Sequence, residues 1–313
     1  MINILVCCNR NDYYLTKICV GSIRFYYPDN PIYILKDEAN GAFDTTEIEK
    51  AWNVRKIEYP EKKFGWSGSK MFFYTDLRFK GQPFLVIDSD IVFVGKLLDE
   101  PWAADFREDV IVSPEETIDP STPWFTRTYF DVNTIRKTYP DYVFPGYTFN
   151  CGQLFCRPGF IQRQTVAEYF DFDQFPRWKR LDLLPLVDQS LFNVMFPRME
   201  KQGALKIGKY AYMYWSEHTN TAEMDLEKIR EGTHYPGLIH WAGALRIPDI
   251  SKMTRPDILT FFENFYYSKV PGGKNKQALR RTKAVLLLSL KKNISSLLSL
   301  AKKVIRPAKP ANA

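Results

Sequence analysis

PFLVIDSDIVFVG, at residues 83–95, is the stretch of the sequence that decides the fold class. An apolar run from Phe84 to Ile87 leads into Asp88-Ser89-Asp90, and a second apolar run follows directly. Apolar residues that do not alternate with polar ones are typical of a strand buried on both faces, as in a parallel sheet. The stretch therefore predicts one buried strand of an α/β fold, interrupted by two carboxylates.

These two carboxylates are candidate metal ligands. In open α/β sheets, ligands bind beyond the carboxyl ends of the strands, and alternate residues of an extended chain point the same way. Asp88 and Asp90 are therefore expected to face one cation, Mn²⁺ or Mg²⁺, bound together with a substrate diphosphate. The alternative is that Asp88 caps the following turn or forms a salt bridge. A second D-x-D, at 171–173, follows a polar helical stretch and lacks the strand context.

Length and composition fit one large α/β domain with an appendage. The chain has 313 residues, 45% of them apolar. No run of about 20 apolar residues is present, so we expect no membrane-spanning helix, and residues 1–12 lack the features of a signal peptide. The five cysteines lie in apolar segments, which indicates reduced core thiols in a cytoplasmic protein. Three histidines and the lack of C-x-x-C make a zinc site unexpected.

Positive charge is concentrated at one end of the chain. Residues 274–313 hold eleven Lys and Arg and no Asp or Glu, so this segment has a charge of +11. Because the formal net charge of the chain is +7, residues 1–273 have a charge of −4. The basic balance therefore does not indicate a nucleic-acid-binding body, and we expect no nucleic-acid partner. We expect a catalytic body at 1–273, with a donor half near 1–113 and an acceptor half near 114–273, and a separate basic tail.

The tail has the pattern of a basic amphipathic helix. Apolar residues recur every three or four positions between Leu287 and Ile305, and lysines flank that stripe. This composition is typical of a segment that lies on an anionic membrane surface, here residues 277–309. The alternatives are packing on the body, self-association and binding of an acidic protein. If the segment binds a membrane, the protein is a peripheral membrane protein at the cytoplasmic face.

The first 60 residues predict a β-α-β-α-β alternation, which is typical of a parallel sheet. The expected strands are 2–8, 32–35 and 54–59, and the expected helices are 14–26 and 45–52. The turn after the first strand has no G-x-G-x-x-G, which disfavours a standard dinucleotide fold. Polar residues near this turn are candidates for contacts with a nucleotide, or else are solvated turn residues: Cys8, Asn9, Arg10 and Asp12.

Further candidates lie at the starts and ends of predicted elements. Lys70 begins a helix predicted to reach Phe79 and to pack beside the D-S-D strand, where its charge would neutralise phosphate; the alternative is an exposed helix lysine. An irregular region at 114–148 has aromatics that stack on sugars or fill the core, namely Trp124, Phe125, Tyr129 and Tyr147.

Three later segments complete the set of candidates. Asn150 and Gly152 open a strand, where a glycine lets a ligand approach the backbone. Asp188 and Gln189 head an apolar helix; they face a sugar, or Asp188 caps the helix. His240 ends another strand and is a structural residue or a third metal ligand.

Taken together, these motifs resemble the GT-A glycosyltransferases, and most of all the family-8 retaining galactosyl- and glucosyltransferases, which include glycogenin and lipopolysaccharide enzymes. The resemblance covers about residues 2–250. It rests on four motifs in the same order as in the family: D-S-D at 88–90, F-N-C-G at 149–152, D-Q-S-L-F-N at 188–193 and I-H-W-A-G at 239–243.

The resemblance implies roles for individual residues. Asp88, Asp90 and His240 would bind Mn²⁺. Asp188 and Gln189 would sit at the reacting face as catalytic residues. The remaining matched or neighbouring positions would bind the donor: Cys8, Asn9, Asp12, Lys70, Ser89, Asn150, Gly152, Gly243 and Arg246. Two departures from the family matter: Arg246 stands near the place of a diphosphate-binding lysine, and Ser190 replaces the second Asp of D-Q-D.

The expected function is therefore metal-dependent transfer of a hexose from a nucleoside-diphosphate sugar, a UDP-sugar, to a glycan or lipid-linked acceptor. Family 8 implies retention and a role in cell-surface polysaccharide or lipopolysaccharide assembly. One alternative is a sugar nucleotidyltransferase, which is expected to have a glycine-rich loop after the first strand that C-C-N-R-N-D lacks. Another is a non-catalytic glycan- or partner-binding protein.

Overall fold

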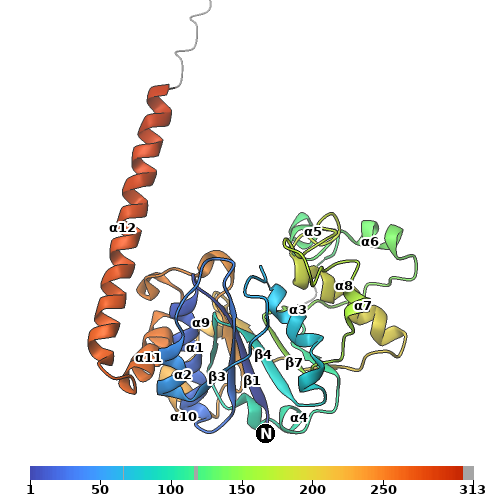
Figure 1. The fold of residues 1–313 in the computed structure, drawn as a ribbon, viewed down its shortest axis with the longest axis horizontal. Helices are drawn as coiled ribbons and strands as arrows, with labels where there is room; N and C mark the ends of the chain where they lie inside the picture. Colours follow the sequence, from blue (N-terminus) through green and yellow to red (C-terminus); the bar gives the residue numbers. More distant parts are fainter. Residues whose placement is uncertain (66, 116–118, 306–313) are drawn as a thin grey trace, which may run out of the picture.

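The computed structural model describes residues 1–65, 67–115 and 119–305 (Figure 1). Its central sheet has seven strands in the order β3-β2-β1-β4-β7-β6-β8. The strands are β1 (Asn3–Asn9), β2 (Ile32–Asp37), β3 (Val54–Lys56), β4 (Phe84–Asp88), β6 (Val110–Val112), β7 (Gln153–Cys156) and β8 (Ile207–Lys209). Only β7 runs antiparallel to its neighbours among these strands. The predicted α/β fold with a mostly parallel sheet is confirmed.

Both faces of this sheet are buried, as the unbroken apolar runs predicted. In β1, Ile4 and Val6 pack in one core cluster, whereas Leu5 belongs to the other. The first cluster lies under α1 (Tyr13–Tyr26) and α11 (Pro256–Ser268), and the second lies under α3 (Gly68–Tyr74) and α8 (Val187–Lys201) (Figure 1). Successive residues of a strand point to opposite faces, so a strand covered on both sides is apolar throughout.

The stretch at 83–95 forms two strands, not one. β4 ends at Asp88, and β5 (Ile91–Phe93) belongs to a second, three-stranded sheet with β10 (Leu238–His240) and β9 (Met213–Trp215). The prediction of one continuous strand was wrong because the polar D-S-D turn redirects the chain between the two sheets. Since β5 pairs antiparallel with β10, Ile91 lies opposite His240. This pairing brings His240 to the D-S-D turn.

Several helices differ from their predicted extents. The helix expected to run to Phe79 stops at Tyr74, where the Thr75 hydroxyl donates to the carbonyl of Met71, and a 3₁₀ turn η1 (Leu77–Phe79) follows. Between β7 and α8 lies the short α7 (Arg163–Val166). The remaining short elements are α2 (Thr46–Trp52), η2 (Leu97–Asp99), α4 (Pro101–Ala104), α9 (Thr219–Ala222), α10 (Leu226–Glu231), η3 (Gly243–Leu245) and η4 (Ile250–Lys252).

The region at 114–148, expected to be irregular, contains two helices in its described part. α5 (Pro123–Thr128) and α6 (Val132–Thr138) begin at Thr122 and Asp131, whose side chains accept hydrogen bonds from first-turn amides. Two of its aromatics, Phe125 and Tyr129, are buried in the core, whereas Trp124 is exposed. Phe125 and Tyr129 therefore fill the core and do not stack on a sugar.

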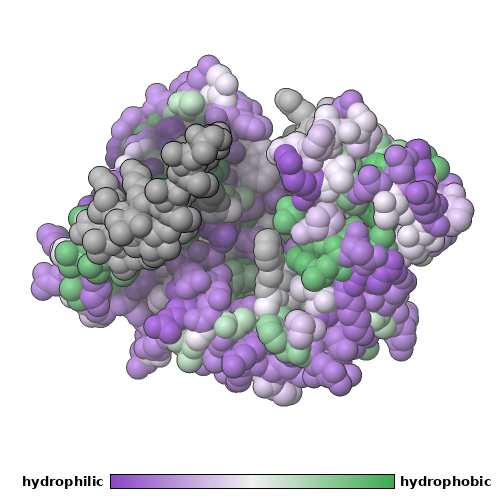
Figure 2. Space-filling model, turned by 90° about the horizontal axis from the view of Figure 1, so that it is seen from above, coloured by the Kyte–Doolittle hydropathy of each residue, from purple (hydrophilic) through white to green (hydrophobic). Residues whose placement is uncertain are grey.

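The C-terminal helix α12 (Gly273–Ile305) starts against α11 and then extends away from the body (Figure 1). No helix in the described ranges combines the length and the apolar composition needed to cross a bilayer. Residues 306–309 of the predicted membrane-binding segment lie outside the described residues. Figure 2 views the body from the carboxyl ends of the parallel strands and shows a hollow near its middle, bordered by both hydrophilic and hydrophobic residues.

Candidate active site

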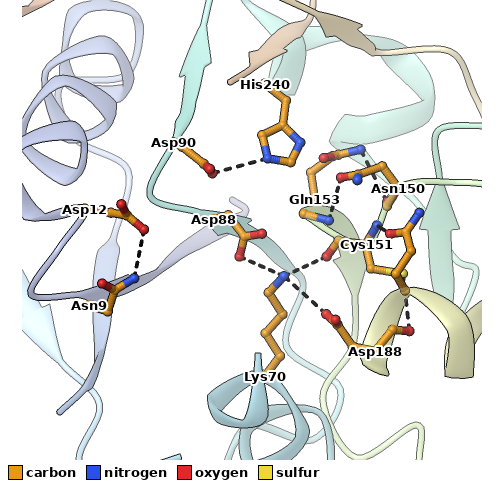
Figure 3. A network of polar contacts seen from close by, with 12 residues as sticks. Asn9, Asp12, Lys70, Asp88, Asp90, Asn150, Cys151, Gln153, Asp188 and His240 are labelled. Atoms are coloured by element: carbon orange, nitrogen blue, oxygen red, sulfur yellow. Dashed lines mark hydrogen bonds and ion pairs between the residues drawn. The ribbon is translucent and has the colours of Figure 1, made fainter. Parts of the chain in front are cut away.

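A cluster of two carboxylates and an imidazole lies where β4 and β10 end (Figure 3). Asp88, Asp90 and His240 each offer one ligand atom, and these atoms lie within 4.8 Å of one another. Nε2 of His240 is 3.2 Å from Oδ1 of Asp90, and both side chains are buried. The backbone of the cluster is fixed, since the amide of Trp241 donates to the carbonyl of Asp90.

This cluster fits a divalent cation. Within the described residues, the buried His240 Nδ1 has no hydrogen-bond partner, and the buried Asp90 Oδ1 has the contact with His240 Nε2 at 3.2 Å but no further hydrogen bond. Carboxylate oxygens are ligands that Mg²⁺ and Mn²⁺ prefer, and an added imidazole favours a transition metal over Mg²⁺. Two acidic side chains so close together need a positive charge between them. The residues predicted to bind a metal are therefore brought together in one place.

The protein supplies part of the charge balance itself. The pKa of Asp88 is raised to about 6, because burial and the charge of Asp90 raise it more than Lys70 lowers it. Burial also raises the pKa of Asp90, but His240 and then Arg246 lower it more, so that the pKa of this carboxyl falls below its usual value. The two acids of the D-S-D turn thus have different partners, Lys70 and His240.

Lys70 is a buried cation, not the exposed helix lysine of the alternative reading. Its Nζ lies 2.7 Å from Oδ1 of Asp88 and 3.6 Å from Oδ2 of Asp188, and it donates to the carbonyl of Cys151 at 2.8 Å. Burial lowers the pKa of Lys70, but the two carboxylates raise it more, so the amine stays charged. Two of its N–H groups therefore have acceptors in the protein, Asp88 and Cys151, and Asp188 is a further ion-pair partner. Contact with a phosphate stays a prediction.

Gly152 lets the start of β7 approach His240. A Cβ at this position would lie 2.6 Å from Cε1 of His240 and 2.7 Å from Oδ1 of Asn150. That oxygen accepts a hydrogen bond from the amide of Gly152 at 2.7 Å. The glycine was expected to admit a ligand; here it admits the imidazole and the Asn150 side chain. Binding of a donor sugar by the two residues stays a prediction.

Asp188 lies in the first turn of α8, but it does not cap the helix. The N-cap residue is Leu186, without a side-chain hydrogen bond, and the Asp188 carboxylate is directed at Lys70 instead. The capping alternative is therefore wrong. Because Lys70 contacts both Asp88 and Asp188, it links the D-S-D turn to the head of α8.

The amide of Gln189 holds the backbone of the F-N-C-G segment. Its Oε1 accepts from the amide of Cys151 at 2.8 Å, and its Nε2 donates to the carbonyl of Phe149 at 3.1 Å. Asn193, one turn later, accepts from the amide of Phe149 at 2.9 Å and donates to its carbonyl at 2.9 Å. Sequence reasoning gave Asn193 no role, although two amides four residues apart share a helix face. A place for Gln189 at the reacting face stays a prediction.

The turn after β1 is linked to the metal cluster through Arg246. Asn9 Nδ2 donates to Oδ2 of Asp12 at 2.9 Å, and Arg246 NH1 lies 2.6 Å from the same oxygen and 3.5 Å from Oδ2 of Asp90. Arg246 follows Gly243, whose φ of +61° suits glycine. The arginine thus places positive charge at the edge of the cluster, from a side chain that is 35% exposed.

Three other residues lie near the site: Cys8, Ser89 and Glu115. The side chain of Cys8 packs in the core cluster under α1, so only its backbone is available to a nucleotide. Ser89 is buried between the two carboxylates. Glu115, which no motif indicated, accepts from the hydroxyl of Tyr129 at 2.8 Å and interacts electrostatically with His240; burial raises the pKa of Glu115.

Comparison with known proteins bears on the fold. No protein-family model matches the sequence, and no curated protein matches it. The solved structure of the galactosyltransferase LgtC, in complex with donor and acceptor sugar analogs, aligns over 88% of this chain and 100% of its own, with a TM-score of 0.52 and 15% identity. The chain has the GT-A fold of glycosyltransferases.

Two further GT-A structures are longer than this chain. The bifunctional glycosyltransferase WbbM has a TM-score of 0.51 at 13% identity; the alignment covers 90% of this chain and 52% of WbbM. GlyE of Streptococcus pneumoniae TIGR4 has a TM-score of 0.51 at 13% identity; the alignment covers 84% of this chain and 60% of GlyE. The chain therefore spans about half of WbbM and 60% of GlyE. The likeness establishes the fold, and the function is argued from the site.

Proposed function

We propose that the protein is a glycosyltransferase that uses a divalent cation, Mn²⁺, to transfer a hexose from a UDP-sugar to a glycan or lipid-linked acceptor. The observation that carries the proposal is the Asp88, Asp90 and His240 cluster, placed at the strand ends of a GT-A fold. The aligned LgtC structure holds donor and acceptor sugar analogs, which supports the same class of substrates for this chain.

The chemistry follows from what the leaving group needs. A bound divalent cation would supply Lewis-acid stabilisation of the diphosphate that leaves when the glycosidic bond breaks. Asp88, Asp90 and His240 would hold that cation. Arg246 adds fixed positive charge beside it, where a partly dry pocket makes charge count for more than in water. Lys70 orients Asp88, because it bonds that carboxylate at 2.7 Å.

Asp188 is the protein carboxylate proposed at the reacting face. It is buried and lies beside Lys70, which keeps it close to the D-S-D turn. The four motifs shared with family 8 favour transfer with retention, on one face of the sugar or through a covalent intermediate on a carboxylate such as Asp188. Under inversion the same carboxylate would act as the base toward the acceptor hydroxyl.

Slow hydrolysis of nucleotide sugars tests the reaction class without knowledge of the acceptor. The expected result is turnover of a UDP-sugar, within a panel of UDP-, GDP- and ADP-sugars, that requires Mn²⁺ and stops when a chelator removes it. Equal turnover with and without the chelator would contradict the role of the cation. Turnover of GDP-sugars alone would contradict the proposed donor.

The proposed acceptor is lipid-linked because α12 offers a surface suited to an anionic membrane. One side of its first turns, at Arg280 and Ala284, packs on the body. Leu279, Leu286 and Leu290 are exposed and, at 3.6 residues per turn, lie within about 40° of one another on one side of the helix. The helix lacks acidic residues, so its charge complements anionic lipid. This supports a place at the cytoplasmic face of a membrane in cell-surface polysaccharide assembly.

Vesicle binding tests this placement. The wild-type protein is expected to sediment with phosphatidylglycerol-containing vesicles and not with phosphatidylcholine vesicles. Joint replacement of Leu286 and Leu290 with serine is expected to weaken vesicle binding by at least about tenfold, because these two exposed leucines would insert into the bilayer and serine would not. The matched control replaces two exposed apolar residues of the body, Leu77 and Val143, with serine. An equal effect of both double variants, or equal binding to neutral vesicles, would contradict the placement.

A further inference from the structure

We propose that Arg280, in the first turns of α12, is a positioning residue for the active-site segment that carries Arg246. The inference rests on the proposed function, because it gives Arg246 the task of placing positive charge beside the metal cluster. It makes the start of α12 part of the active-site architecture, in addition to any membrane contact made by the rest of the helix.

The start of α12 is anchored by a buried carboxylate of α11. Glu263 is 2% exposed, and two arginines of α12 pair with it: NH2 of Arg280 lies 2.5 Å from Oε1, and NH2 of Arg281 lies 2.6 Å from Oε2. Gln277 adds a hydrogen bond to Oε2 at 3.0 Å. A buried carboxylate that pairs with two arginines and accepts from Gln277 fixes the helix at a defined rotation, since all three side chains must come from the same side of α12.

The two arginines differ in one respect. NH1 of Arg280 donates a hydrogen bond to the carbonyl of Pro248 at 3.0 Å, whereas the other contact of Arg281 is to Oδ1 of Asn264 on α11. Arg280 is also the more buried of the two, with 16% of its side chain exposed against 44% for Arg281. Arg280 therefore joins three elements: α12, α11 and the segment that follows β10.

The segment from Gly243 to Pro248 has little hydrogen bonding of its own. Its described backbone bonds are those of the short η3 turn, from Leu245 to Ala242 and from Arg246 to Gly243, both at 3.3 Å. Contacts from outside therefore set its position. The Arg280 bond to Pro248 holds one end of it, two residues from Arg246.

Small shifts of this segment matter because Arg246 reaches two separate elements. Its guanidinium lies 2.6 Å from Asp12, at the start of α1, and 3.5 Å from Asp90, in the D-S-D turn. A displacement of about 1 Å in a group that contacts the donor is enough to weaken that contact. Loss of the Arg280 bond is thus expected to weaken donor binding through Arg246, without any change in the groups that contact the donor.

The test compares Arg280→Ala with Arg281→Ala, since each removes one arginine from Glu263 and only the first removes the bond to Pro248. Hydrogen exchange is measured at the amides of Leu245 and Arg246, and KM and kcat are measured for the hydrolysed nucleotide sugar. Arg280→Ala is expected to speed exchange at both amides and to raise KM about tenfold, with kcat changed by less than about twofold. Arg281→Ala is expected to leave exchange and KM at wild-type values.

Equal effects of the two variants on exchange and KM would overturn the inference and leave a shared anchoring role at Glu263. If Arg280→Ala does not fold, Arg280→Gln is measured in its place, because glutamine keeps part of the stem and a neutral NH2 group. The two proposals fail separately. A wild-type protein that hydrolyses no nucleotide sugar contradicts the proposed function, while the exchange comparison still decides whether Arg280 holds the segment.

Discussion

Replacement of Asp90 with asparagine is expected to abolish Mn²⁺-dependent hydrolysis of the donor, with a rate lower by about a thousandfold, because several kcal/mol of leaving-group stabilisation depend on the bound cation. Asparagine keeps the shape of the side chain but removes the charge that His240 and Arg246 face at 3.2 and 3.5 Å. The rate is measured with saturating Mn²⁺, so that it reports the lost ligand charge and not a lower occupancy of the metal site.

The chain offers a matched control for this variant. Asp173 belongs to the second D-x-D, where the carboxylate of Asp171 accepts from the amides of Asp173 and Gln174. Asp173 is exposed. Asp173→Asn makes the same chemical change in the same short motif and is expected to leave the rate at the wild-type value. A wild-type rate in Asp90→Asn would contradict the assignment of the metal site.

Replacement of Lys70 with methionine is expected to lower the free energy of unfolding by about 3 kcal/mol, the order found when one partner of a buried ion pair is removed. Methionine fills much of the same volume, so the effect comes from charge. Asp188 and the carbonyl of Cys151 would lose a buried partner, and Asp88 would lose its contact at 2.7 Å. Urea denaturation, followed by the far-ultraviolet circular dichroism of the helices, measures the change.

The control for Lys70 is a surface pair of the same kind. Lys179 lies 3.2 Å from Asp171 with 43% of its side chain exposed, and such pairs contribute at most about 1 kcal/mol. Lys179→Met is therefore expected to change the free energy of unfolding far less than Lys70→Met. Equal changes in the two variants would mean that Lys70 is not an essential buried partner of the two carboxylates.

The parts of the fold that depend on local sequence were predictable. β4 and β6 of the central sheet are continuous apolar runs, and the apolar residues of α1 recur at helical spacing, so these elements follow from periodicity. The D-S-D turn was predicted as a site because two acids interrupt an apolar run at the carboxyl end of a strand, where ligands bind in α/β sheets. What the run did not indicate is that the chain changes sheets at this turn, since an apolar strand looks the same in either sheet.

The assembly of the site depends on contacts distant in sequence, which no local pattern specifies. Arg246 and Asp12 are 234 positions apart and meet only because β10 lies beside β5. For Lys70, the sequence indicated a cation near the D-S-D strand but not its burial between Asp88 and Asp188. Gln189 was chosen as a polar residue at a helix head, whereas its amide is used to hold the carbonyl of Phe149.

The boundary between body and tail shows the same limit. The distribution of charge along the sequence predicted a boundary between residues 273 and 274, and α12 begins at Gly273. Its first turns nevertheless pack on α11 through Arg280 and Arg281, so the start of the basic segment belongs to the body. Charge composition marks where lysines and arginines accumulate, but it does not show which of them have a buried partner such as Glu263.

Calorimetric titration of UDP into the wild-type protein, with Mn²⁺ present and then with a chelator, tests the central claim most directly. It needs neither the correct sugar nor the acceptor, and it reports binding instead of turnover. The account predicts saturable binding of one UDP per chain with Mn²⁺ and a loss of affinity of at least about a hundredfold without it. Absence of binding in both conditions, or equal affinity in both, would contradict the account of this site as a metal-dependent nucleotide-sugar site.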